Sequence, residues 1–142
     1  SYALTEAQDL GIAEADPAYD VDGIDTAGKV VILANSIFGM NARYEDVSVT
    51  GIRDITPEAL NLVWERGYHI KLIGEVPSLT VKPMLVPRRN PLAVGGTLNV
   101  ASIETDLSGT ITVTGLGAGS IETASAIVSD IVSIYTSRQV DG

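Results

Sequence analysis

The sequence predicts an α+β fold in which a mixed β-sheet of about four to five strands packs against helices on one face. Two observations lead to this prediction. Apolar residues recur with a helical period near both ends of the chain, and four stretches between residues 68 and 114 have the composition of strands. The length of 142 residues suits one compact unit, so we expect residues 1–142 to form a single domain.

Two helices are expected in the first quarter of the chain. Residues 2–10 have the pattern of a short helix that Gly11 ends. A longer helix is expected to start near Asp22, which is a favourable N-cap, with Asp25 beside the free N–H groups of its first turn. Apolar residues on nearly every side predict that this helix is buried; they are Ile24, Ala27, Val30, Val31, Ile32, Leu33, Ala34, Ile37 and Phe38.

The remaining elements follow from turn and cap residues. Alternating apolar residues from Val47 to Ile52 predict a short strand, and Thr56 followed by Pro57 is typical of the start of a helix that extends to about Arg66. Four strands are then expected, over residues 68–76, 79–86, 98–104 and 110–114. A last helix over about residues 121–138 has an apolar stripe made of Ala124, Ile127, Val128, Ile131, Val132 and Tyr135.

Composition excludes several classes of function. The formal net charge of -9 disfavours binding to nucleic acid or to an anionic membrane surface. The chain has no cysteine, so neither a disulfide framework nor a thiolate metal site is possible. No stretch resembles a signal peptide or a membrane span, and we therefore expect a cytoplasmic protein. The single histidine, His69, is interpreted as structural, because it has no local partners for a metal site.

The segment from Gly11 to Lys29 is the main candidate for a functional site. Lys29 follows five carboxylates, those of Glu14, Asp16, Asp20, Asp22 and Asp25. Asp25 and Lys29 are four residues apart on one helix face, which is the spacing of a surface ion pair worth a few tenths of a kcal/mol. The apolar neighbours of Lys29 favour a second interpretation, in which a partly desolvated ammonium points into a crevice and donates a proton. Asp16 and Asp22 are interpreted as turn and cap residues.

The spacing of these residues resembles the signature segment of the homoserine dehydrogenases. The matching positions are Ala7, Gly11, Asp16, Pro17, Asp20, Gly23, Asp25 and Lys29. The resemblance continues through residues 67–74 and 117–119 and covers almost the whole chain. It does not include the N-terminal nucleotide-binding half of that family, because no strand and glycine-rich turn of the Rossmann type occur here. We therefore expect the chain to be the catalytic and dimerisation domain of a longer protein, and to be inactive by itself.

The resemblance implies a reaction and a set of roles. It implies NAD(P)-dependent interconversion of L-aspartate 4-semialdehyde and L-homoserine, in the pathway to threonine, methionine and isoleucine. Carried over to this sequence, Lys29 would be the general acid and base, and Glu14, Asp20 and Asp25 would bind substrate. Gly11, Glu14 and Gly119 would lie against the cofactor, which is NADP or NAD. The family resemblance also implies a homodimer. Many relatives have proline where Glu122 stands, so the helix that follows Gly119 can start differently here.

Alternative interpretations stay open at this point. Without the resemblance, glycines 115, 117 and 119 are as well explained by a tight strand-to-helix turn as by a cofactor contact, and the resemblance favours the cofactor contact for Gly119. The domain could also be a non-catalytic binding or oligomerisation module that has kept the fold without the chemistry. The complete set of carboxylates with Lys29 favours the enzyme, because a degenerate module has little reason to retain it.

Overall fold

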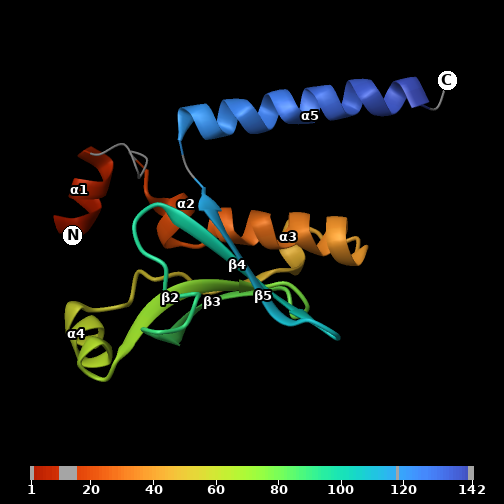
Figure 1. The fold of residues 1–142 in the computed structure, drawn as a ribbon. Helices are drawn as coiled ribbons and strands as arrows, with labels where there is room; N and C mark the ends of the chain where they lie inside the picture. The colour runs from red at the N-terminus through yellow and green to blue at the C-terminus, as the bar shows by residue number, and fades with distance from the viewer. Residues whose placement is uncertain (1, 10–15, 118, 141–142) are drawn as a thin grey trace. The chain divides into compact units, whose positions relative to one another are not determined.

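The structure, a computed structural model, describes residues 2–9, 16–117 and 119–140 and forms two compact units. The first is Ser1–Ala93 and the second is Val94–Gly142. The elements of the first unit are α1 (Tyr2–Asp9), α2 (Ala18–Val21), α3 (Ile24–Phe38), the 3₁₀ turn η1 (Tyr44–Asp46), β1 (Ser48–Val49), α4 (Pro57–Glu65), β2 (Tyr68–Glu75) and β3 (Thr80–Pro87). Figure 1 labels the helices and strands.

The sheet of the first unit has three strands in the order β1, β3, β2. Strand β1 pairs with β3 in parallel, and β2 pairs with β3 in antiparallel register from Tyr68 opposite Pro87 to Glu75 opposite Thr80. The connection between β2 and β3 includes Leu79, which adopts a positive φ of 49°. The predicted boundaries of β2 and β3 are confirmed to within two residues.

Helix α3 packs across this sheet through small and branched side chains. The core contains Ala27, Val30, Val47 and Val81, with Val31, Leu72 and Leu79 packed against it. Gly74 in β2 allows the close approach, because a Cβ there would lie 2.6 Å from Cγ2 of Val30. The first two thirds of α3 are therefore held against the face of the sheet that carries Leu72 and Gly74.

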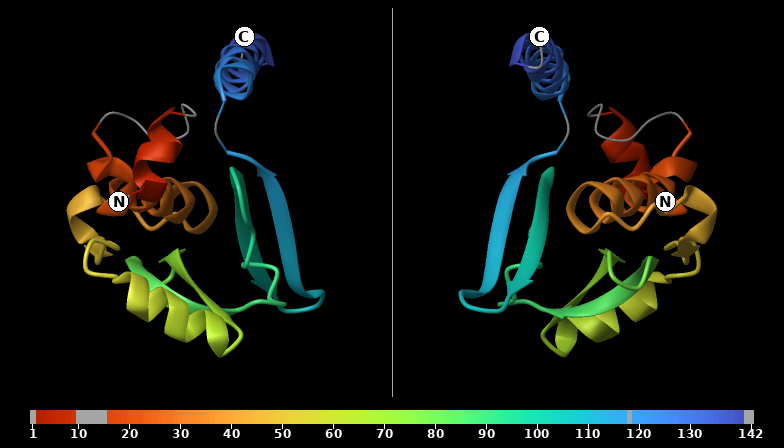
Figure 2. Two further views of the ribbon diagram at one scale, coloured as in Figure 1. Left: turned by 90° about the vertical axis from the view of Figure 1, so that its left-hand side faces the viewer. Right: turned by 90° about the vertical axis from the view of Figure 1, so that its right-hand side faces the viewer.

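Helix α4 lies at the opposite face of the sheet. Thr56 caps α4, since its Oγ1 accepts a hydrogen bond of 3.2 Å from the backbone N of Ala59. Trp64 near the end of α4 meets His69 edge to face, with 5.3 Å between ring centroids. Successive side chains of a strand alternate between faces, so His69 points away from the face of Leu72 and Gly74. Figure 2 likewise shows α3 and α4 on opposite sides of the strands.

The second unit consists of a hairpin and one long helix. Strands β4 (Leu98–Thr105) and β5 (Gly109–Leu116) pair in antiparallel register, and helix α5 (Ser120–Val140) follows. The turn between the strands ends at Gly109, which has a φ of 66°. The apolar stripe predicted on this last helix is confirmed in position, but its side chains are exposed; Ile127, for example, is 56% exposed.

The α+β class is confirmed by this arrangement, but two details of the prediction are wrong. Among the described residues, five strands form a three-stranded mixed sheet and a separate two-stranded hairpin, rather than one sheet. Helices lie on both faces of the three-stranded sheet rather than on one. Strand pairing depends on contacts between distant parts of the chain, and the local strand patterns do not specify it.

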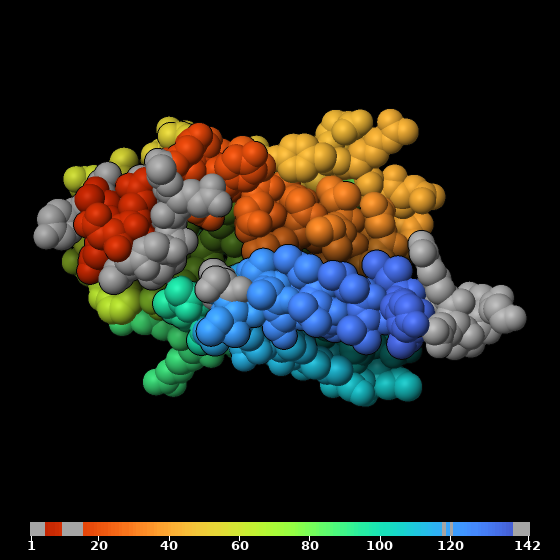
Figure 3. All heavy atoms as spheres, turned by 90° about the horizontal axis from the view of Figure 1, so that it is seen from above, coloured from red at the N-terminus to blue at the C-terminus, as the bar shows by residue number. Residues whose placement is uncertain are grey.

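The prediction that α3 is buried in the core, made from its apolar residues on nearly every side, is also wrong for most of the helix. Only Ala27, Val30 and Ala34 of this helix are buried. Ile32 and Ile37 are 65% and 62% exposed, and Phe38 is also exposed. Figure 3 draws the side chains of α3 as orange spheres.

Candidate functional site

The described part of the candidate segment forms two helices joined by a tight turn. Helix α2 contains Asp20, and α3 contains Asp25 in its first turn and Lys29 in its second. Gly23 joins them with a φ of 80°, and an added Cβ there would lie 3.1 Å from Cγ1 of Val49. A left-handed residue packed this closely on the core requires glycine. The turn therefore fixes where Asp20 stands relative to the start of α3.

Asp25 and Lys29 form the ion pair predicted from their spacing. Nζ of Lys29 lies 2.7 Å from Oδ2 of Asp25, and each side chain is 51% exposed. The acid precedes the base by one helical turn, which is the favourable order. The prediction that Lys29 points into a crevice is not borne out, because half of its side chain faces solvent. In this position the ammonium is held by one carboxylate and remains open to a ligand.

The other predicted residues are placed as follows. Asp20 lies in α2, and within residues 16–117 and 119–140 its carboxylate forms no hydrogen bond or ion pair. Gly119 directly precedes α5 with a φ of 141°, and an added Cβ would meet the carboxylate of Glu122. It belongs to the second unit. Gly11 and Glu14 lie outside the described residues.

Asp16 and Asp22 have different roles in the structure. Oδ1 of Asp16 accepts a hydrogen bond of 3.1 Å from the backbone N of Ala18, which confirms Asp16 as a turn residue. Asp22 is not the N-cap of α3: Gly23 occupies that position without a side-chain hydrogen bond. The Asp22 carboxylate is instead engaged by Arg53, because a guanidinium offers two charged donors where a helix start offers neutral ones.

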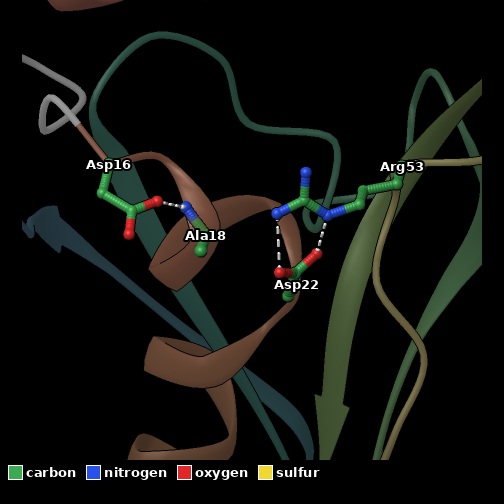
Figure 4. A network of polar contacts seen from close by, with 4 residues as sticks. All are labelled: Asp16, Ala18, Asp22 and Arg53. Carbon is green, nitrogen blue, oxygen red and sulfur yellow. Dashed lines mark hydrogen bonds and ion pairs between the residues drawn. The ribbon is translucent and has the colours of Figure 1, made fainter.

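The Arg53–Asp22 pair was not predicted from the sequence. Nη2 of Arg53 donates to Oδ2 of Asp22 at 2.7 Å, and Nε donates to Oδ1, so the contact is bidentate (Figure 4). The hydrogen bonds from Arg53 lower the pKa of Asp22, and Asp22 in turn raises the pKa of Arg53. The two residues are 31 positions apart. The available signal was an arginine directly after the predicted first strand.

A second group of side chains gathers between α4 and β2. A pocket of about 220 Å³ is lined by Leu60, Asn61, Val63, Trp64, Tyr68, His69 and Ile70. The guanidinium of Arg88 stacks on the ring of Trp64 at 3.7 Å. His69 therefore packs against an aromatic ring, in agreement with its structural interpretation.

In the part of the chain that the structure describes, no three histidine, aspartate or glutamate side chains gather closely enough to hold a metal ion. No helix in that same part is long and apolar enough to cross a membrane.

Comparison with known proteins identifies similar sequences and structures. A family model described as homoserine dehydrogenase matches residues 1–132. A curated homoserine dehydrogenase from Methanocaldococcus jannaschii is 61% identical over 139 residues, which are 96% of this chain and 41% of that protein. A protein from Pseudomonas canavaninivorans named NAD(+)-dependent homoserine dehydrogenase is 39% identical over 95% of this chain and 41% of its own length.

The fold of the chain is similar to that of a solved homoserine dehydrogenase. A crystal structure of a homoserine dehydrogenase from Thiobacillus denitrificans matches with a TM-score of 0.83 at 41% identity. The matched region covers 92% of this chain and 32% of the chain in the crystal structure. The chain thus spans about two fifths or less of the length of these relatives.

Proposed function

The chain belongs to the homoserine dehydrogenase family, and from this premise we propose that the protein it represents interconverts L-aspartate 4-semialdehyde and L-homoserine with a nicotinamide cofactor. The observation that supports this most directly is the Asp25–Lys29 ion pair within the matched signature segment. Its ammonium is held at one side and half exposed at the other. That arrangement suits a group that must contact a substrate oxygen and exchange a proton with it.

Lys29 is the proposed proton donor and acceptor. During aldehyde reduction, its ammonium stabilises the negative charge that develops on the carbonyl oxygen and donates a proton to that oxygen. During oxidation, the neutral amine accepts the hydroxyl proton of homoserine. Asp25, 2.7 Å from Nζ, holds the lysine side chain toward one position. This restriction favours proton transfer, because a flexible lysine would otherwise sample more rotamers.

Carboxylates are the proposed ligands of the substrate. Homoserine carries an α-ammonium group, and carboxylates are suited to accept its hydrogen bonds. Asp20 supports this role, since its carboxylate has no partner within the described residues and is on the helix preceding Asp25. We assign Glu14 to the ammonium by its match to the family segment. Asp25 can also hold the substrate hydroxyl.

The cofactor is proposed to be NADP or NAD. When bound, a nicotinamide cofactor exchanges a hydride with the substrate carbon. The conformation of Gly119 fits a backbone that lies close to such a group, because its φ of 141° suits glycine. The neighbouring carboxylate of Glu122 can accept hydrogen bonds from ribose hydroxyls or from a carboxamide, whereas it would repel a pyrophosphate. This favours the nicotinamide end at Gly119. Gly11 and Glu14 are proposed cofactor contacts by family match.

The remaining assignments rest on the family. We propose a cytoplasmic homodimer that serves the pathway to threonine, methionine and isoleucine. Sedimentation of the full-length protein tests the assembly, and a strict monomer would contradict it. A non-catalytic module of the same fold is less well supported, because such a module has little reason to retain the complete set of carboxylates together with Lys29.

Turnover with matched substrates tests the function. Full-length protein is given L-homoserine or 4-hydroxybutanoate, which lacks the ammonium, with NAD or NADP, and reduced nicotinamide is followed by absorbance. We expect oxidation of homoserine and a loss of at least about tenfold in kcat/KM with the analogue, as for a lost charge-assisted contact. Residues 1–142 alone are expected to be inactive. No turnover of homoserine with either cofactor would contradict the proposal, as would equal turnover of the two substrates.

A further inference from the structure

The junction between α2 and α3 is held by a short segment that follows β1. The backbone N of Ile52 donates a hydrogen bond of 2.8 Å to the carbonyl oxygen of Val21. Gly51 packs directly on the same residues, since an added Cβ would lie 2.5 Å from that oxygen and 2.8 Å from Cα of Asp22. No other residue could stand at position 51 without displacing the junction. The chain has therefore brought a backbone segment into contact with the turn that separates Asp20 from Asp25.

Arg53 completes this contact with a side chain. Its guanidinium donates two hydrogen bonds to the Asp22 carboxylate, and Figure 4 shows the two side chains pointing toward one another. A bidentate pair fixes orientation as well as distance, because both nitrogens and both oxygens lie in defined planes. Asp22 is the last residue before the left-handed Gly23. Holding Asp22 thus sets the direction in which the chain enters α3.

The described acidic side chains of the segment from Gly11 to Lys29 have separate partners, with one exception. Asp16 accepts from the backbone of Ala18, Asp22 is bound by Arg53, and Asp25 is bound by Lys29. Asp20 is left with its carboxylate open among the described residues. The pairing of Asp25 with Lys29 suits the proposed proton transfer, and the open carboxylate of Asp20 suits the proposed binding of substrate.

We propose that Arg53 is a positioning residue for the candidate active site, acting through its bidentate contact with Asp22 to fix Asp20 relative to Asp25 and Lys29. The inference rests on the proposed function, because it assigns a purpose to a contact around those three residues. It does not place Arg53 on substrate. Catalysis is sensitive to such positioning, since a displacement of about 1 Å can cost a hundredfold in rate.

The test compares three arginine variants in the full-length enzyme. Arg53→Met removes the guanidinium, and Arg53→Lys keeps the charge but not the planar fork. Arg43→Met is the matched control, since Arg43 is an exposed arginine that pairs with Glu45 at 3.7 Å outside the segment. We expect kcat/KM for homoserine to fall about tenfold or more in Arg53→Met and about threefold in Arg53→Lys, with melting temperatures near that of Arg43→Met. Where Arg53→Met fails to fold, Arg53→Lys decides.

A double-mutant cycle separates positioning from a general structural role. In an Asp20→Asn background the carboxylate that Arg53 positions is absent. Arg53→Lys and Arg53→Met should therefore lower kcat/KM by a clearly smaller factor there than in the wild-type background. The inference is overturned if both variants keep kcat/KM within twofold of Arg43→Met, or if their losses are fully additive with Asp20→Asn. A wild-type enzyme that does not oxidise homoserine would instead overturn the proposed function. The two failures are therefore distinguishable.

Discussion

Replacing Gly74 with alanine would push α3, the helix that carries Lys29, away from the sheet. The added Cβ would lie 2.6 Å from Cγ2 of Val30 and 3.1 Å from Cγ2 of Thr26. Ordinary contact between carbon atoms requires about 3.5–4.0 Å, so helix and strand must separate by about 1 Å. Val30 cannot swing aside easily, because its branched Cβ allows few rotamers and it is only 3% exposed.

The expected effect on stability follows from this overlap. Overpacking a core by one methyl group costs about 1–3 kcal/mol, which for a domain of this size lowers the melting temperature by about 4–12 °C. Lys29 directly precedes Val30, so its Nζ should move with the helix. We expect kcat for homoserine oxidation to fall about tenfold at a temperature where the variant is fully folded.

Thermal unfolding and steady-state kinetics measure the two effects. Gly28→Ala is the matched control for stability, since Gly28 lies in the same helix and an added Cβ there meets nothing within 4 Å. Alanine is the better helix former, so the free energy of unfolding of this control should equal that of the wild type or exceed it by up to about 1 kcal/mol. Its melting temperature should therefore not fall below that of the wild type. If Gly74→Ala melted as high as Gly28→Ala, the close packing of α3 on β2 described above would be refuted.

The remaining predictions concern a pKa, a helix cap and a glycine. Because the pKa of Asp22 in the folded chain is below its ordinary value of 3.8, the stabilisation from Arg53 is complete above that value and is lost as the pH falls through the folded value. Asp22→Asn should flatten this acid dependence in unfolding measured from pH 6 to pH 2, and an unchanged profile would argue against the pair. Thr56→Ala removes the cap on Ala59 and should lower the free energy of unfolding by about 1 kcal/mol in urea titrations, where a value near zero would contradict the cap. Gly119→Ala should raise the KM for the nicotinamide cofactor, whereas an unchanged KM would remove Gly119 from the cofactor site.

Element positions were predictable where their signals are local. Thr56, Pro57 and Gly67 define α4 because capping, a fixed φ and a left-handed turn each act within a few residues. The strands followed similarly from composition and turn residues. The division of the strands between two sheets was not predictable in this way. It depends on which strands find each other, and the alternation within one strand carries no such information.

The candidate site shows the same distinction between local and distant contacts. The Asp25–Lys29 pair was predictable, because helix geometry alone brings residues four apart onto one face. The exposure of Lys29 was not, since it depends on what covers α3. Asp22 was misassigned as a cap because its partner, Arg53, lies 31 positions later and is brought close only by the fold. A contact between residues this far apart depends on the whole fold and not on the local sequence.

The proton-transfer role of Lys29 is tested most directly by the turnover number of Lys29→Ala in the full-length enzyme. Lys82→Ala is the control, since Lys82 is exposed on β3 and has no assigned role. We predict that Lys29→Ala lowers kcat for homoserine oxidation by about 10²-fold or more, as for a lost acid–base group, while Lys82→Ala stays within about twofold of wild type. A Lys29→Ala enzyme that turns over homoserine at the wild-type rate would contradict the proposal that this lysine moves the proton.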